Sequence, residues 1–163
     1  EITVARPSAD VFAYIARAEY LPDYVTDFQS VEQVGGGEPG VGTQYRYKMG
    51  RGAEGTFEWT TFEPNSRLAW HGPAVKAGPG SMEPAGSWEF SDASGGGTQV
   101  KLIMAPTPGG LFKLLAPFMA AGMRKGNARA LERLKARLEE GAGAPTPPAP
   151  PPGPAGQSPA PDS

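Results

Sequence analysis

The chain has 163 residues and a formal net charge of −2 at pH 7, so it has no overall positive field that would attract nucleic acid. It contains no cysteine and one histidine, His71, which excludes disulfides, thiol catalysis and multi-histidine metal centres. No apolar run approaches a membrane span, and the start at Glu1 lacks a signal-peptide pattern. We therefore expect a cytoplasmic protein with no metal, no cofactor and no integral membrane segment, subject to any piece upstream of Glu1.

Seven segments have the alternating apolar and polar residues of short strands. The clearest alternation runs from Val41 to Met49, with Tyr45 and Tyr47 on the apolar face. Short turns rich in glycine and proline separate the segments, which favours an antiparallel sheet with one buried face. The predicted strands are residues 1–5, 28–34, 41–49, 54–63, 67–71, 87–91 and 98–104.

Helical spacing of apolar residues occurs in three places. Two short helices are expected at 9–17 and 19–25, and one long helix at 111–138. At about 1.5 Å per residue the long helix would measure about 40 Å, more than a small domain needs for packing alone. The order of elements predicts an α+β domain in which a curved, seven-stranded antiparallel sheet wraps around the C-terminal helix. Residues 75–83 are rich in glycine and proline and show no pattern, so we expect an irregular, mobile rim there.

The composition changes abruptly after Glu140. Residues 141–163 contain nine prolines and a single charge, Asp162, which leaves too little apolar surface to offset the entropy of ordering. We expect one domain at 1–140, followed by a disordered Pro-rich tail with polyproline II character. Weak binding of a partner through this tail is a second interpretation, less favoured than a passive tail.

Several local phrases stand out by their order and spacing. They are ITV at 2–4, RPSADVFAYI at 6–15, LPDY at 21–24, GVGT at 40–43, FEPNSRLAW at 62–70 and GTQV at 97–100. Together they resemble the SRPBCC superfamily, the START-like helix-grip group, and in particular its polyketide cyclase/dehydrase-like branch. The resemblance covers about residues 1–140 and implies a sheet that grips the C-terminal helix around a hydrophobic cavity. Members bind lipids, sterols or polyketides, and some catalyse cyclisation or dehydration, but the resemblance carries no single catalytic motif.

A cavity of this kind would be lined by aromatic and methionine side chains. The kinked half of the long helix, divided from the rest by Pro117, Gly122 and Gly126, would form one wall and a gate. Core packing without a ligand is the alternative interpretation for every one of these side chains. The predicted ligand-binding residues are Tyr45, Tyr47, Met49, Trp59, Trp70, Trp88, Phe90, Met104, Phe112, Leu115, Phe118 and Met119.

Glu58 and His71 are the catalytic candidates. His71 is the one side chain whose intrinsic pKa lies near neutrality, but strand alternation points it outward if Trp70 faces inward. Glu58 faces solvent if Trp59 faces inward, and faces inward if Phe62 does. A bulge in the strand would change the answer, so the sequence leaves the orientation of Glu58 open.

The sequence thus favours binding of a hydrophobic small molecule, lipid or polyketide-like, between the sheet and the long helix. An enzyme of the polyketide cyclase/dehydratase type remains the alternative. Such an enzyme would use Tyr45 or Tyr47 as a hydrogen-bond donor and Glu58 or His71 as a base. We expect no nucleic-acid partner.

Overall fold

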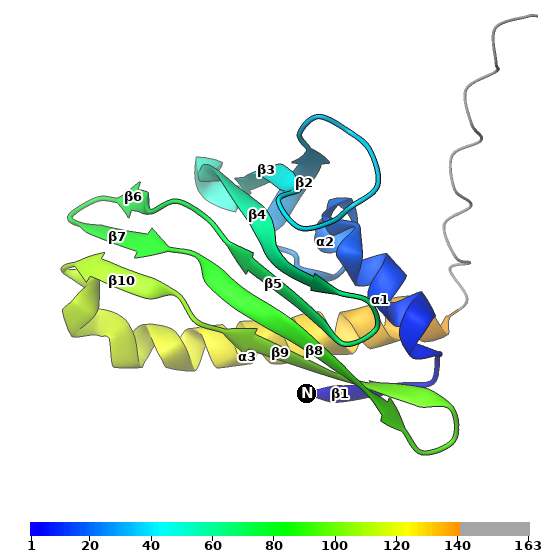
Figure 1. Ribbon diagram of the computed structural model, residues 1–163. Helices are drawn as coiled ribbons and strands as arrows, with labels where there is room; N and C mark the ends of the chain where they lie inside the picture. Colours follow the sequence, from blue (N-terminus) through cyan, green and yellow to red (C-terminus); the bar gives the residue numbers. More distant parts are fainter. Residues whose placement is uncertain (141–163) are drawn as a thin grey trace, which may run out of the picture.

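Seven strands form the main sheet of the computed structural model, which describes residues 1–140 except for the side chains of Arg51, Ala77 and residues 119–121 (Figure 1). The strand order is β1-β9-β8-β5-β4-β3-β2, and every neighbouring pair is antiparallel. The predicted seven-stranded antiparallel sheet is confirmed, whereas the predicted tail at 141–163 lies outside the described residues. The strands are β1 (Ile2–Val4), β2 (Phe28–Gln33), β3 (Gln44–Met49), β4 (Glu54–Glu63), β5 (Arg67–His71), β8 (Ala85–Ala93) and β9 (Gly97–Met104).

Helices cover the inner face of this sheet. Two short α-helices follow β1, and the long helix α3 contacts β1 and α2. The predicted α+β arrangement, with a curved sheet around a long C-terminal helix, is confirmed. Among the helices within residues 1–140, none is both long and apolar enough to cross a membrane. The helices are α1 (Ser8–Ala16), η1 (Ala18–Tyr20), α2 (Leu21–Tyr24), η2 (Gly50–Gly52) and α3 (Phe112–Glu139), of which η1 and η2 are 3-10 turns.

The core lies between the inner face of the main sheet and these helices. On α1, Val11 and Ile15 recur at the helical spacing and are buried against the sheet. On the strands, burial alternates along the chain, as in β3, where Tyr45 and Tyr47 are buried between exposed neighbours. Both periods therefore direct their apolar residues into one shared core.

A bulge in β4 decides which side chains of that strand face inward. The register with β5 shifts between Trp59 and Thr61, so one extra residue lies on β4. Trp59 pairs with Trp70 before the shift, and Phe62 pairs with Leu68 after it. The shift brings Trp59 and Phe62, three positions apart, to the same inner face.

The end of α3 that follows residue 129, here called the back half (130–139), is fixed to the rest of the domain. Leu131, Leu134 and Leu138 are buried in the core. The Arg6 Nε donates a hydrogen bond to the Leu138 carbonyl at 2.9 Å, and the Ala5 N–H donates to Glu139 Oε1 at 2.8 Å. The segment between β1 and α1 therefore holds the C-terminal turn of α3 in place.

A second, three-stranded sheet continues the main sheet at one end (Figure 1). It consists of β6 (Val75–Ala77), β7 (Gly80–Glu83) and β10 (Thr107–Gly110), in the order β10-β7-β6. These strands prolong β5, β8 and β9 in the same lateral order, because β6 follows β5, β7 leads into β8 and β10 follows β9. The front of α3 contacts β7 and β10.

Backbone hydrogen bonds keep the strands joined where the main sheet passes into the small one. The Gly72 N–H donates to the Pro84 carbonyl and the Ala105 N–H to the Ala85 carbonyl, both at 2.9 Å. The expectation of an irregular segment at 75–83 is therefore wrong. Its strands are short and interrupted by glycine and proline, so they lack the alternation by which strands are recognised.

Candidate functional site

The aromatic residues at the centre of the inner face are packed as core. Tyr45 is fully buried, and its ring stacks on Phe57 with centroids 5.2 Å apart. The Tyr45 hydroxyl and the Trp59 Nε1–H both donate to the Ala16 carbonyl, at 3.3 and 3.1 Å. Burial raises the pKa of Tyr45 to about 12, so its phenol stays protonated at neutral pH. The polar groups of both rings are thus engaged within the protein.

Three further predicted ligand-binding residues also lie in or against the core. Tyr47 is buried, burial raises its pKa, and its ring lies 5.4 Å from that of Phe28. Phe90 is buried with its ring 5.4 Å from Phe12. Met49 is half-buried and packs against the same cluster. In their packing these side chains match the alternative interpretation, core without ligand.

Three tryptophans connect this core with the junction between the main sheet and the small sheet. Trp59, Trp70 and Trp88 follow one another with centroids 6.4 Å apart at each step. Trp70 is half-buried, and its ring covers the backbone of Gly86, where any Cβ would collide with it. Gly86 pairs in register with Met104, so the indole of Trp70 ends beside the last inward residue of β9.

A groove of about 430 Å³ lies beyond that point, between α3 and strands β7, β9 and β10. Leu102 and Met104 reach it from the inner face of β9, and α3 supplies the opposite wall with Met123. Of the predicted ligand-binding residues whose side chains the structure describes, Met104 alone lines this groove. The lining residues are Met82, Leu102, Met104, Ala105, Pro106, Pro108, Ala116, Met123, Arg124 and Asn127.

The groove is apolar except at one side. Its charged and amide groups are Arg124 and Asn127, which lie three residues apart on α3 and therefore on neighbouring positions of the helix surface. None of the described residues that line it carries a carboxylate or an imidazole. The site can therefore enclose an apolar body and donate hydrogen bonds to an oxygen at its edge, but its lining offers no general base.

Phe112 holds the start of α3 over the small sheet. Its ring lies against the backbone of Gly80 in β7, with three ring atoms 2.5–2.8 Å from the position that a Cβ would occupy. The Leu111 N–H also donates to the Pro79 carbonyl at 3.4 Å. Because Gly80 has no side chain, the ring can pack directly on the strand and set the width of the groove.

The first half of α3, here called the front half (112–123), carries two apolar stripes. The groove side holds Phe112, Ala116 and Met123. A different, exposed side holds Leu114, Leu115 and Phe118; together with Leu111, the residue just before the helix, they are here called the outer stripe. Two predicted ligand-binding residues, Leu115 and Phe118, thus point away from the groove. The side chain of Met119 lies outside the described residues.

Glu58 and His71 lie on the outer face of the main sheet. They form a cross-strand pair, and the Gln44 Nε2 donates to Glu58 Oε2 at 3.4 Å. His71 Nε2 lies 2.9 Å from Glu83 Oε1. The sheet itself separates these side chains from the inner face and from the groove. The structure brings the two catalytic candidates together, but away from the predicted ligand-binding residues.

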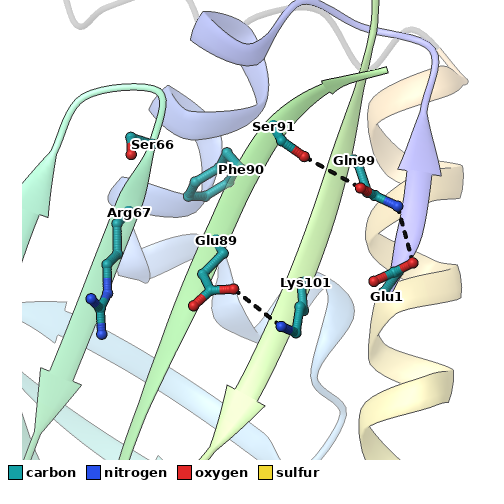
Figure 2. A pocket seen from close by; sticks show the side chains of 8 residues that line it. All are labelled: Glu1, Ser66, Arg67, Glu89, Phe90, Ser91, Gln99 and Lys101. Carbon is teal, nitrogen blue, oxygen red and sulfur yellow. Dashed lines mark hydrogen bonds and ion pairs between the residues drawn. The ribbon is translucent and has the colours of Figure 1, made fainter. Parts of the chain in front are cut away.

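A second hollow, of about 460 Å³, lies on the outer face and is polar (Figure 2). Figure 2 shows its side chains bonded to one another along β8, β9 and β1. Lys101 Nζ lies 3.3 Å from Glu89 Oε2, Ser91 Oγ donates to Gln99 at 3.3 Å, and Gln99 Nε2 donates to Glu1 at 3.0 Å. This hollow is lined mainly by polar and charged side chains, so it does not suit an apolar ligand. Its lining residues are Glu1, Ser66, Arg67, Glu89, Phe90, Ser91, Gln99 and Lys101.

One known protein family matches nearly all of the described part of the chain. The sequence profile of the family described as polyketide cyclase / dehydrase and lipid transport matches residues 1–139. The chain belongs to this family. The predicted resemblance to the polyketide cyclase/dehydrase-like branch is thereby confirmed. A comparison with curated proteins found no match.

Solved structures share the fold at low sequence identity. A conserved protein from Geobacillus kaustophilus is 15% identical, with a TM-score of 0.68 over 86% of this chain and 93% of its own. The Zhui aromatase/cyclase from Streptomyces sp. R1128 is 17% identical, with a TM-score of 0.66 over 88% and 93%. The protein TTHA0849 from Thermus thermophilus is 21% identical, with a TM-score of 0.64 over 87% and 96%. At these identities the likeness shows a shared fold and no more.

Most of the groove was missed from the sequence for identifiable reasons. Met82 and Pro108 belong to the small sheet, which has no recognisable alternation. On α3, Ala116, Met123 and Asn127 are separated by seven and four residues, a spacing that places them on one side of the helix. That spacing was a usable signal, but the bulkier residues of the outer stripe obscured it.

Proposed function

We propose that the protein binds a hydrophobic small molecule, a lipid or polyketide-like compound, in the groove between α3 and strands β7, β9 and β10. The observation that carries the proposal is the lining of this groove, which is apolar apart from Arg124 and Asn127. Its volume of about 430 Å³ falls in the usual range of small-molecule sites, about 300–1,000 Å³.

The lining also fits a ligand of variable shape. Met82, Met104 and Met123 approach the groove from a strand of each sheet and from α3. Unbranched thioether side chains change rotamer at little cost and make favourable contacts with aromatic rings. The Arg124 guanidinium presents several donors to a carbonyl or carboxylate oxygen, and the Asn127 amide adds a neutral one. An apolar body with one oxygen-rich end is the chemistry that this lining suits.

Catalysis of the polyketide cyclase/dehydratase type is the second candidate. The family description names this chemistry, and the Zhui aromatase/cyclase shares the fold. Arg124 and Asn127 could stabilise an enolate oxygen, but removal of a proton next to a carbonyl also requires a base within reach. Glu58 and His71 lie on the outer face of the sheet, so binding without turnover is the better-supported proposal.

Blocking the groove tests the proposal. Ala116 is half-buried in the groove wall, so Ala116→Trp would fill the space with an indole, whereas Ala128→Trp adds the same group to an exposed position of α3. The probe is cis-parinaric acid, a fluorescent polyene fatty acid, titrated into each protein. We expect Ala116→Trp to weaken binding by about tenfold or more, which corresponds to about 1.4 kcal/mol, and Ala128→Trp to bind as the wild type does.

Equal affinities in the two tryptophan variants, or no binding of the probe to the wild type, would contradict the proposal. The catalytic alternative is separated by two more variants, Glu58→Gln and His71→Ala. We expect both to bind the probe normally. A polyketide substrate converted by the wild type but not by one of these variants would favour the enzyme instead.

A further inference from the structure

We infer that the outer stripe of α3 is a docking surface for a lipid bilayer that carries anionic headgroups. This inference goes beyond the proposed ligand site and does not depend on it, since the outer stripe lies on the side of α3 that faces away from the groove. The stripe consists of Leu111, Leu114, Leu115 and Phe118, whose spacing of three, four and seven residues from the first places them along one side of the helix.

The side chains of the outer stripe project into solvent. Leu114 is 74% exposed and Phe118 is 78% exposed, the highest values among the large apolar residues that the structure describes as exposed. A helix on the surface of a domain normally turns polar residues to solvent. In Figure 1 the front half of α3 has β10 and β7 on one side and no described element on the other. A contiguous apolar surface of this kind marks an interaction site.

Positive charge follows this apolar surface along the helix. Residues 105–131 contain four cationic side chains and no acidic one, although the net charge of the whole chain is −2. The other residues therefore carry a net charge of −6. Lys125 and Arg129, seven and eleven residues after Phe118, are exposed on the same side of the helix, whereas Lys113 lies on another side. Two exposed cations of an acidic protein thus continue the side of α3 that carries its most exposed apolar residues.

This combination selects a bilayer over other occupants. A second copy of the chain docked through the same face would bring two cationic surfaces together, which like-charge repulsion opposes. A helix that presents projecting apolar side chains with cations beside them is instead the arrangement of interfacial helices, whose apolar side enters the headgroup region while Lys and Arg contact anionic lipids. Docking in this way would place the groove, on the other side of the same turns, close to the membrane surface.

Vesicle co-sedimentation of the full chain tests the inference. Vesicles of phosphatidylcholine alone are compared with vesicles of phosphatidylcholine and phosphatidylglycerol. We expect the wild type to bind the anionic vesicles, and binding to weaken as salt is raised. The double variant Leu114→Ser/Phe118→Ser should bind about tenfold less or weaker still, since it removes the inserted apolar groups. Lys125→Glu should weaken binding to anionic vesicles in the same direction.

Matched variants separate docking from general effects. Val41 is 69% exposed and lies far from α3 in the chain, so Val41→Ser removes an exposed apolar group elsewhere and should leave binding unchanged. Arg46 is exposed on the main sheet, so Arg46→Glu matches the charge change of Lys125→Glu and should have little effect. Ala116→Trp, which fills the groove, should still dock. This result would keep the inference intact even if the proposed ligand site were wrong.

Three results would overturn the inference. The first is equal sedimentation of the wild type and the double variant, whose folding is checked by circular dichroism. The second is a wild type that fails to sediment with either kind of vesicle. The third is a wild type that is dimeric in solution and becomes monomeric in the double variant without binding vesicles, which would assign the outer stripe to self-association.

Discussion

The two halves of α3 carry similar apolar side chains in opposite surroundings. In the back half, Leu134 is fully buried and Leu138 lies under the segment that joins β1 to α1. In the front half, Leu114 and Phe118 are largely exposed, and the groove side faces only the small sheet. The residue types are alike, so the difference comes from what packs against each half.

The two halves of α3 therefore contribute differently to the stability of the fold. Burying a leucine contributes about 1.5–3 kcal/mol, so Leu131, Leu134 and Leu138 make the back half a major contributor to stability. The front half buries much less surface, and its apolar groups face the groove or solvent. The turns that stabilise the fold are therefore different from the turns that we propose to bind.

Truncating one leucine in each half gives the largest expected difference. Leu134→Ala should lower the free energy of unfolding by about 3 kcal/mol, because it removes buried methyl groups and leaves a cavity. Leu114→Ala should change it by no more than about 0.5 kcal/mol, because the side chain is already in solvent. Urea denaturation monitored by tryptophan fluorescence measures both. Similar losses in the two variants would show that the front half is packed against something in solution.

Glycine substitutions test how the front half is held. Gly80→Ala would place a Cβ inside the ring of Phe112, so we expect a loss of about 1–2 kcal/mol and weaker binding of cis-parinaric acid. Gly126→Ala is the control, since no side chain or backbone lies near that position, and alanine should stabilise the helix by about 0.5–1 kcal/mol. Denaturation midpoints and probe titrations give both readouts. If Gly80→Ala changed neither stability nor probe binding, Phe112 would not pack against β7 in solution.

Alkaline pH probes the anchored end, where buried or half-buried tyrosines lie on or against α1 and α2. Burial raises the pKa of Tyr14, Tyr24 and Tyr45 in the folded state, that of Tyr45 to about 12. Below about pH 10 these phenols are protonated in both states and stability is unaffected. Above it the unfolded chain ionises first, so each such tyrosine should lower the free energy of unfolding by about 1.4 kcal/mol per pH unit, up to its folded pKa.

Denaturant midpoints measured from neutral pH to about pH 12 would follow this decline. Tyr45→Phe removes one ionising group and should make the decline shallower. The front half contains no tyrosine, so its outer stripe should not shift the profile. A profile that is flat above pH 10 would contradict the burial of these phenols.

The main architecture could be predicted because its signals are local. Strands such as β3 and β4 alternate clearly, and the apolar spacing of 111–138 matches α3 to within one residue at each end. Among the strand boundaries, the start of β3 differed most, since Gly42 has a positive φ of 83° and the Thr43 N–H donates to the Gly40 carbonyl. That turn ends before Gln44, which leaves Val41 outside β3.

The candidate site could not be predicted in the same way, because it depends on contacts between distant segments. Periodicity shows that the front half of α3 is apolar, but it cannot tell which of two apolar stripes meets the sheet, as Ala116 does and Phe118 does not. Pro108 makes β10 hard to recognise as a strand from the sequence. Proline is tolerated there because β10 is an edge strand. The face of Glu58 depended on the bulge at Trp59, which has no signature in composition.

The junction of the two sheets, at Gly72, Pro84 and Ala105, also separates part of the groove from the main core. Three groove residues lie on the far side of this junction and outside the main core. They are Met82 of β7, Pro108 of β10 and Ala116 of the front half of α3. A protein tolerates substitutions best where little packing depends on them. Substitutions at Met82, Pro108 and Ala116 should therefore change the shape of the groove with little loss of stability, whereas Leu102 also packs against the core of the main sheet.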